Sequence, residues 1–153
     1  MKILLAIDGS SCSDAAVEIV AGRLWPAGTE VRVISVVKPH VSLVSGTLGP
    51  SIKYYEEAEM AEHQQALEVV ERAANKIRSN GGSTEELKIT TKLFFGSPKC
   101  IIVEEAERWA ADLIILGSHD RLSWQRRLLG SVSAVVAAQA ACPVEIVRPG
   151  QHV

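Results

Sequence analysis

Two short segments of the sequence carry residue types that suit a phosphorylated ligand. Gly130 and Ser131 precede apolar residues at helical spacing, and the free N–H groups and dipole of a helix N-terminus attract anions. The hydroxyl groups of Ser131 and Ser133 can donate hydrogen bonds to phosphate oxygens. Near the start of the chain, Asp8 follows a short apolar run, and its carboxylate can accept a hydrogen bond from a ribose hydroxyl or hold Mg²⁺. These residue types could together contact the phosphate and ribose groups of a nucleotide.

The same residues also have purely structural interpretations. Gly130 and Ser131 can act only as a helix N-cap. Gly117 follows a second apolar run and lets a backbone approach a ligand closely, but it can also be only a tight turn. Asp8 can be only a local turn former. Taken one at a time, these residues leave both interpretations open.

Composition narrows the class of protein. The 153 residues are 47% apolar and 22% charged with a net charge of −2, which is typical of one globular domain. We expect no nucleic-acid partner, because a basic footprint is missing, and no membrane span, because no apolar run approaches about 20 residues. The cysteines form no CxxC pair and the histidines no metal-binding spacing, so we expect neither a disulfide framework nor a Cys/His metal site. A cytoplasmic location is expected.

The elements that must position these residues alternate along the chain. Short apolar runs alternate with amphipathic segments, which predicts a parallel five-stranded sheet with helices on both faces. Ser11 and Asp14 predict a capping box at the first helix, and Met60, Leu67 and Ala74 repeat every seven residues in the second. The expected strands cover residues 2–7, 31–37, 87–93, 113–116 and 144–147; the expected helices begin near residues 11, 55, 97 and 130, the second ending near 79 and the last near 142.

The chain resembles the universal stress protein family along its whole length. The segments that carry the resemblance are residues 3–10, 96–98, 111–119 and 142–144. The ATP-binding branch of that family has the motif G-x2-G-x9-G-(S/T), which Gly117, Gly130 and Ser131 match and in which Asp120 replaces the second glycine. The resemblance implies a single domain over residues 1–153. It also implies a three-layer α/β fold with sheet order 3-2-1-4-5, similar to the adenine nucleotide alpha hydrolases.

The resemblance further implies a ligand, a set of binding residues and a partner. ATP or AMP would bind, with Asp8 as a candidate ligand of an accompanying Mg²⁺. The implied binding residues are Ala6, Ile7 and Val36 for the base, Asp8 for the ribose, Gly117, His119, Asp120, Gly130, Ser131 and Ser133 around the phosphates, and Leu116 and Val132 along the wall. The implied partner is a second copy of the chain, paired through the last strand, which consists of Val144, Glu145, Ile146 and Val147.

Asp120 is the departure from the family motif. A carboxylate about 5 Å from one phosphate charge costs about 3 kcal/mol at an effective dielectric constant of about 20, which lowers affinity roughly a hundredfold. Solvent or the neighbouring Arg121, Arg126 and Arg127 would reduce this penalty, and Mg²⁺ held by Asp120 would reverse its sign. An Asp120 side chain that points to solvent would have little effect. We expect nucleotide binding to be retained, at lower affinity if the carboxylate faces the phosphates.

Three functions fit these residues. The first is an adenine-nucleotide-binding protein with a regulatory role in the stress response. The second is a dimeric adaptor that binds no nucleotide, which Asp120 favours and the retained Gly130 and Ser131 disfavour. The third is a slow ATP hydrolase, but the sequence has no Walker lysine in GxxxxGK[ST] form and offers only His119 as a base near the loop. We therefore expect at most weak hydrolysis and assign no catalytic residue.

Overall fold

The computed structural model describes residues 1–39, 52–80, 87–118 and 129–150. One five-stranded parallel sheet has the order β3-β2-β1-β4-β5, which confirms the predicted order. The strands are β1 (Lys2–Ala6), β2 (Glu30–Val37), β3 (Lys88–Phe95), β4 (Leu113–Gly117) and β5 (Val144–Val147). The helices are α1 (Ser11–Gly22), α2 (Ile52–Asn80), α3 (Pro98–Trp109) and α4 (Ser131–Gln139).

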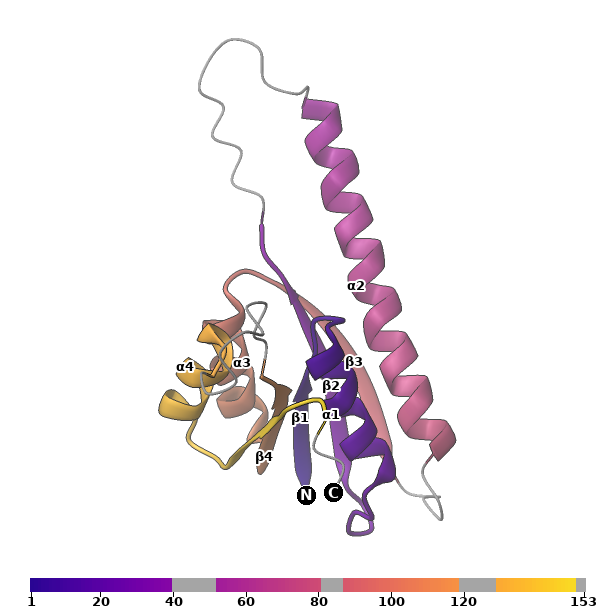
Figure 1. Ribbon diagram of the computed structural model, residues 1–153, viewed down its shortest axis with the longest axis vertical. Helices are drawn as coiled ribbons and strands as arrows, with labels where there is room; N and C mark the ends of the chain where they lie inside the picture. The colour runs from indigo at the N-terminus through magenta and orange to yellow at the C-terminus, as the bar shows by residue number, and fades with distance from the viewer. Residues whose placement is uncertain (40–51, 81–86, 119–128, 151–153) are drawn as a thin grey trace.

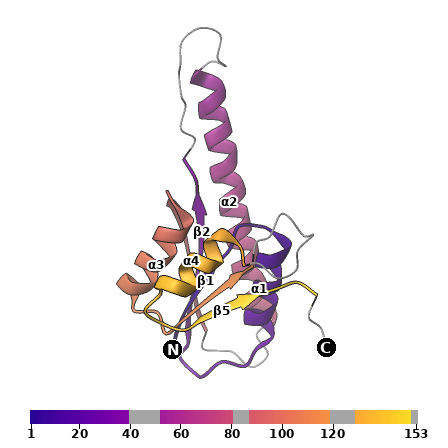
Figure 2. The same cartoon turned by 60° about the vertical axis from the view of Figure 1, so that its left-hand side comes forward.

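Helices cover both faces of the sheet (Figure 1). Successive side chains of a strand point to opposite faces. In β1, Leu5 therefore packs with buried residues of α1 and α2, whereas Leu4 packs with those of α3 and α4. Figure 2 shows the same division, with α3 and α4 on one side of the sheet and α1 and α2 on the other. Because both faces are covered, β1 and β4 are apolar at successive positions rather than at alternate ones.

The central strand β1 lies between β2 and β4. Ala6 at its end pairs with Ile34 of β2 and with Leu116 of β4. The chain moves outward from β1 through β2 to β3, and then returns to place β4 on the other side of β1. Such a reversal leaves a crevice at the carboxyl ends of the two strands beside it, which is where open α/β sheets bind ligands.

The first helix begins differently from the sequence-based expectation. Ser10, not Ser11, is the N-cap of α1, and its hydroxyl oxygen accepts a hydrogen bond from the Ser13 N–H at 3.2 Å. The expected capping box of Ser11 and Asp14 is therefore wrong, because the backbone already turns helical at Ser11. The shift places the N-cap two residues after Asp8, within one tight turn.

The second helix is longer than expected, and part of its apolar pattern is exposed. Met60 and Leu67 have exposed fractions of 72% and 36%, whereas Val70 and Ile77 are buried against the sheet. The first half of α2 extends past the ends of most strands (Figure 1), so it has little of the sheet beneath it. The expected seven-residue repeat of Met60, Leu67 and Ala74 therefore does not mark one buried stripe.

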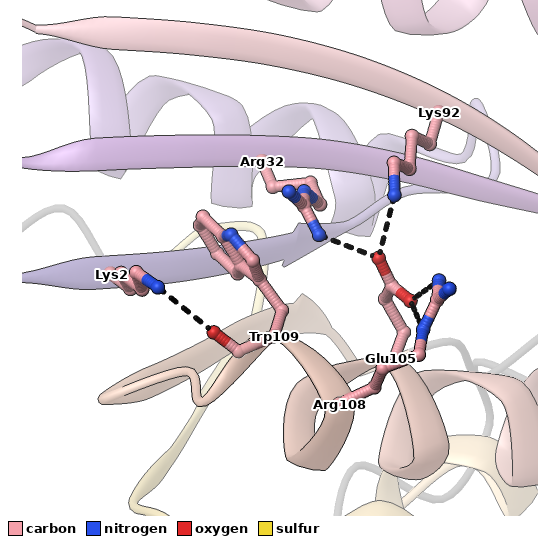
Figure 3. Close-up of polar contacts among 6 residues, drawn as sticks. All are labelled: Lys2, Arg32, Lys92, Glu105, Arg108 and Trp109. Carbon is pink, nitrogen blue, oxygen red and sulfur yellow. Dashed lines mark hydrogen bonds and ion pairs between the residues drawn. The ribbon is translucent and has the colours of Figure 1, made fainter.

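A buried carboxylate joins α3 to the sheet (Figure 3). Glu105 is 2% exposed, and its Oε1 accepts hydrogen bonds from Arg32 Nη1 of β2 at 2.8 Å and Lys92 Nζ of β3 at 3.4 Å. Its Oε2 accepts from Arg108 Nε at 2.9 Å. The Arg32 guanidinium also lies 4.1 Å from the ring centroid of Trp109, a cation–π distance. This carboxylate thus couples two strands and a helix that are far apart in sequence.

The charged state of Glu105 is favoured by these partners. Burial alone raises the pKa of a carboxyl group, but the hydrogen bonds from Arg108 and Arg32 and the charge of Lys92 outweigh it and lower the pKa of Glu105. A carboxyl whose pKa is lower in the folded chain stabilises the fold above its unfolded pKa of about 4.3. That contribution is lost as the pH falls from there through the folded pKa.

We predict that Glu105→Gln lowers the free energy of unfolding by about 3 kcal/mol at pH 7, because Arg32 loses its charged partner in a buried position. Urea denaturation followed by circular dichroism measures this change. The difference from the unsubstituted chain should shrink below about pH 4.3, where Glu105 itself takes up a proton. Glu104→Gln, at an exposed position on the same helix, should change stability by less than about 0.5 kcal/mol. Equal effects of the two substitutions would contradict this role.

Candidate functional site

A cleft of about 610 Å³ opens beyond the carboxyl ends of β1, β2 and β4. The first turn of α4 forms one end of this cleft, and a face of α2 forms a side wall. Eight of the residues predicted from the sequence line it, namely Ala6, Ile7, Asp8, Val36, Leu116, Gly117, Ser131 and Val132. The structure therefore brings the ends of the first, second and fourth strands and the start of the last helix into a single cavity.

Two other predicted residues that the structure describes, Gly130 and Ser133, do not line the cleft. Gly130 is the N-cap of α4, one residue before the lining begins. Ser133 is only 1% exposed, and its hydroxyl donates to the Gly130 carbonyl oxygen at 3.0 Å, so in this structure it stabilises the helix start. His119 and Asp120 lie outside the described residues, and their predicted contacts with phosphate stay predictions.

Some cleft residues were not predicted from the sequence. Ser13, Lys38 and the α2 side chains of Glu62, Gln65, Ala66 and Val69 line the cleft, as do Ile34, Ser35, Val37, Pro98 and Ile102. The α2 residues follow Glu62 at three, four and seven positions, so they share one helical face. That spacing was visible in the sequence. Nothing in it, however, indicated that this part of the helix borders a cavity rather than solvent.

The turn after β1 holds Asp8 at the mouth of the cleft. Asp8 Oδ1 accepts a hydrogen bond from the Ser10 N–H at 3.0 Å, and Gly9 between them has a φ of 78°. This backbone angle favours glycine, so the tight turn depends on the residue type at position 9. Both readings of Asp8 are thus compatible, since one oxygen shapes the turn while the side chain is exposed and lines the cleft.

Gly117 has a packing role that the sequence analysis did not identify. A Cβ atom there would lie 2.5 Å from the carbonyl carbon of Cys12, 2.6 Å from its oxygen and 2.7 Å from the nitrogen of Ser13. Those atoms are backbone in the first turn of α1 and cannot move away as a flexible side chain would. The end of β4 therefore lies directly against α1, and only glycine allows this approach.

The start of α4 is suited to an anion. The N-cap residue of α4 is Gly130, which has no side chain to accept hydrogen bonds from the N–H groups of the first turn. Those groups have no partner within a helix, and the helix dipole adds positive potential at the same place. Ser131 and Val132 in this turn line the cleft. The arrangement can therefore bind a phosphate or carboxylate at the α4 end.

Charged groups of both signs face the cleft. Asp8 and Glu62 are the acidic residues of the described lining, and Lys38 is its basic residue. Within the described ranges no group of three or more His, Cys, Asp and Glu side chains is placed to hold a metal ion. In the same part of the chain, no helix combines the length and apolar character needed to cross a membrane.

Comparison with known proteins shows which family the chain belongs to. The model of the universal stress protein family matches residues 1–148. The chain belongs to the universal stress protein family. A universal stress protein of Methanocaldococcus jannaschii is 34% identical over 149 residues, covering 96% of this chain and 81% of that protein. A universal stress protein of Mycobacterium tuberculosis is 28% identical over 147 residues, covering 95% of this chain but 47% of the relative. The chain thus spans about half the length of this relative.

Solved structures of universal stress proteins have the same fold. UspA from Lactobacillus plantarum superposes with a TM-score of 0.72 at 23% identity, covering 97% of each chain. A family protein of Arabidopsis thaliana with AMP bound gives a TM-score of 0.69 at 18% identity, covering 99% of this chain and 93% of that one. A universal stress protein in complex with cAMP gives 0.64 at 21% identity, covering 98% of both.

We predict that Gly117→Ala destabilises the universal stress protein fold by about 1–3 kcal/mol, because the new methyl group overlaps the α1 backbone. Gly22→Ala in α1 is a matched control, because a Cβ atom there meets nothing within 4 Å. The control should leave stability unchanged or raise it slightly. Midpoints of guanidinium denaturation compare the two variants, and equal midpoints would show that the β4–α1 contact is not tight.

Proposed function

We propose that this universal stress protein binds an adenine nucleotide, AMP or ATP, in the cleft at the ends of β1, β2 and β4, and that this binding serves a regulatory role in the stress response. The observation that carries the proposal is the cleft itself. It joins an apolar wall, an exposed carboxylate and the start of a helix in one cavity of about 610 Å³. We take residues 1–153 as a single domain.

The chemistry of the cleft gives the nucleotide an orientation. The phosphates lie at the start of α4, against the N–H groups near Gly130, Ser131 and Val132 and beside Gly117. The ribose lies at Asp8, whose carboxylate accepts a hydrogen bond from a hydroxyl group. The base packs against apolar residues in or directly after β1 and β2, namely Ala6, Ile7, Ile34 and Val36.

Relatives with bound nucleotides support the ligand class. One similar structure holds AMP and another holds cAMP, and both share the fold of this chain. In this chain a single cleft is lined both by the proposed base wall and by the start of α4. Asp8 is the proposed contact for an accompanying Mg²⁺, together with phosphate oxygens. His119 and Asp120 are proposed to lie beside the phosphates.

Two other functions are distinguished by simple observations. A dimeric adaptor that binds no nucleotide would release no adenine compound when the purified protein is denatured and examined by mass spectrometry. A slow ATP hydrolase would release phosphate well above the rate in buffer. The start of α4 and the exposed Asp8 favour binding over the adaptor function.

We predict that Asp8→Asn lowers AMP affinity about tenfold, because the ribose loses a charged hydrogen-bond acceptor. Asparagine keeps an oxygen that can accept from the Ser10 N–H, so the turn is preserved. Isothermal titration calorimetry measures the affinity. Asp14→Asn makes the same charge change at an exposed position in α1 outside the cleft lining, and it should leave affinity unchanged. An unsubstituted chain that binds neither AMP nor ATP at millimolar concentration would refute the proposed function.

We also propose that two copies pair through β5. This strand is at the edge of the sheet, so its outer backbone groups can pair with another strand. Its charged residue, Glu145, is already paired within the chain, since Arg23 Nη1 and Nη2 donate to its two oxygens at 2.8 Å each. This ion pair lowers the pKa of Glu145. Because the negative charge of Glu145 is paired with Arg23, a second strand beside β5 would not face an unpaired charge.

Light scattering at micromolar concentration should therefore give the mass of two chains of 16.5 kDa each. A chain that is monomeric under these conditions would contradict pairing through β5. The nucleotide proposal would stand in that case, because every residue of the described cleft comes from one chain.

A further inference from the structure

A second hollow of about 560 Å³ adjoins the nucleotide cleft. Its walls are the end of β2, the end of β3 and the first half of α2. Val37, Lys38 and Glu62 line both cavities, so the hollow borders the cleft along these three residues. Nothing in the nucleotide proposal uses this hollow, although the chain presents it directly beside the proposed base.

The hollow is lined by apolar and aromatic side chains that are open to solvent. Phe95 is 57% exposed, and the His63 ring is stacked on it with centroids 5.4 Å apart and an interplanar angle of 22°. Met60 and Pro39 contribute further apolar surface. Covering exposed aromatic and aliphatic surface is favourable, and an aromatic group gains additional stacking energy against such rings.

The charges of the hollow limit what can occupy it. Glu56, Glu59 and Glu62 lie on one face of α2 and all line the hollow, whereas Lys38 is the basic residue among the described lining residues. A group that carries negative charge would be repelled by this excess of carboxylates. A negatively charged occupant is therefore disfavoured, whereas an uncharged aromatic or aliphatic group can pack against Phe95, His63 and Met60.

The position of the hollow identifies the part of the nucleotide that faces it. The start of α4 attracts the phosphates, so the base lies at the other end of the cleft, against Val36. The shared wall of cleft and hollow begins at the next residue, Val37. A substituent on the edge of the base that faces Val37 would therefore extend toward the hollow, whereas a group attached to the phosphates would point away from it.

We propose that this site accepts adenine nucleotides whose base carries an apolar substituent on its exocyclic amine, with the substituent held against Phe95, His63 and Met60. This inference rests on the proposed function, because it requires the nucleotide in the cleft. It adds to that function the recognition of adenine nucleotides whose base is modified.

Titration calorimetry with AMP and N6-benzyl-AMP tests the proposal. N6-benzyl-AMP should bind at least about threefold more tightly than AMP, the size of an aromatic contact. Phe95→Ala and Met60→Ala should each reduce this preference and leave AMP affinity unchanged, since neither residue lines the nucleotide cleft. Leu24→Ala is a control at an exposed apolar residue outside both cavities, and it should leave the preference intact.

The outcomes separate this inference from the function it rests on. Binding of AMP with equal or weaker binding of N6-benzyl-AMP would overturn the inference alone. A preference for the benzyl compound that survives both Phe95→Ala and Met60→Ala would overturn it as well, because the group would lie elsewhere. Failure of both compounds to bind would overturn the proposed function together with the inference.

Discussion

The end of β4 lies against the backbone of the first turn of α1, and this contact is possible because Gly117 has no side chain. The contact fixes α1 close to the sheet. The short turn that carries Asp8 from β1 into α1 must then bend sharply, which Gly9 and the Ser10 N-cap allow. Gly117, Gly9 and the Ser10 N-cap thus act together in the segment that holds Asp8 beside the cleft.

The features that stabilise the fold differ from those that form the cleft. Glu105 joins β2, β3 and α3 through its cationic partners, yet it does not line either cavity. The cleft instead draws on strand ends, a glycine-led helix start and one face of α2. Substitutions at Glu105 and at Asp8 therefore affect separate properties, folding stability in one case and ligand binding in the other.

Much of the fold could be predicted from the sequence, because β1 and β4 are short apolar runs between amphipathic segments. The resemblance to universal stress proteins supplied the strand order, which alternation alone does not determine. The N-cap Ser10 was missed because Ser10 and Ser11 are chemically equivalent capping residues, and only the backbone decides between them. The exposure of Met60 was missed because a repeat along a helix does not reveal where the sheet beneath it ends.

The candidate site was predictable where it depends on residue type and strand ends, and less so where it depends on packing. Asp8, Gly117 and Ser131 are brought together as expected. The hydrogen bond that occupies Ser133 and the contact between Gly117 and α1 arise from tertiary packing, which local sequence does not encode. The α2 wall arises in the same way.

Backbone amide NMR during a titration with AMP shows which residues the nucleotide contacts. If AMP occupies the cleft, shifts at saturation cluster at residues 7–13, 36–38, 117 and 130–132, and β5 and the last turns of α2 are unaffected. Shifts confined to other surfaces, or none at millimolar AMP, would contradict a nucleotide site at the ends of β1 and β4.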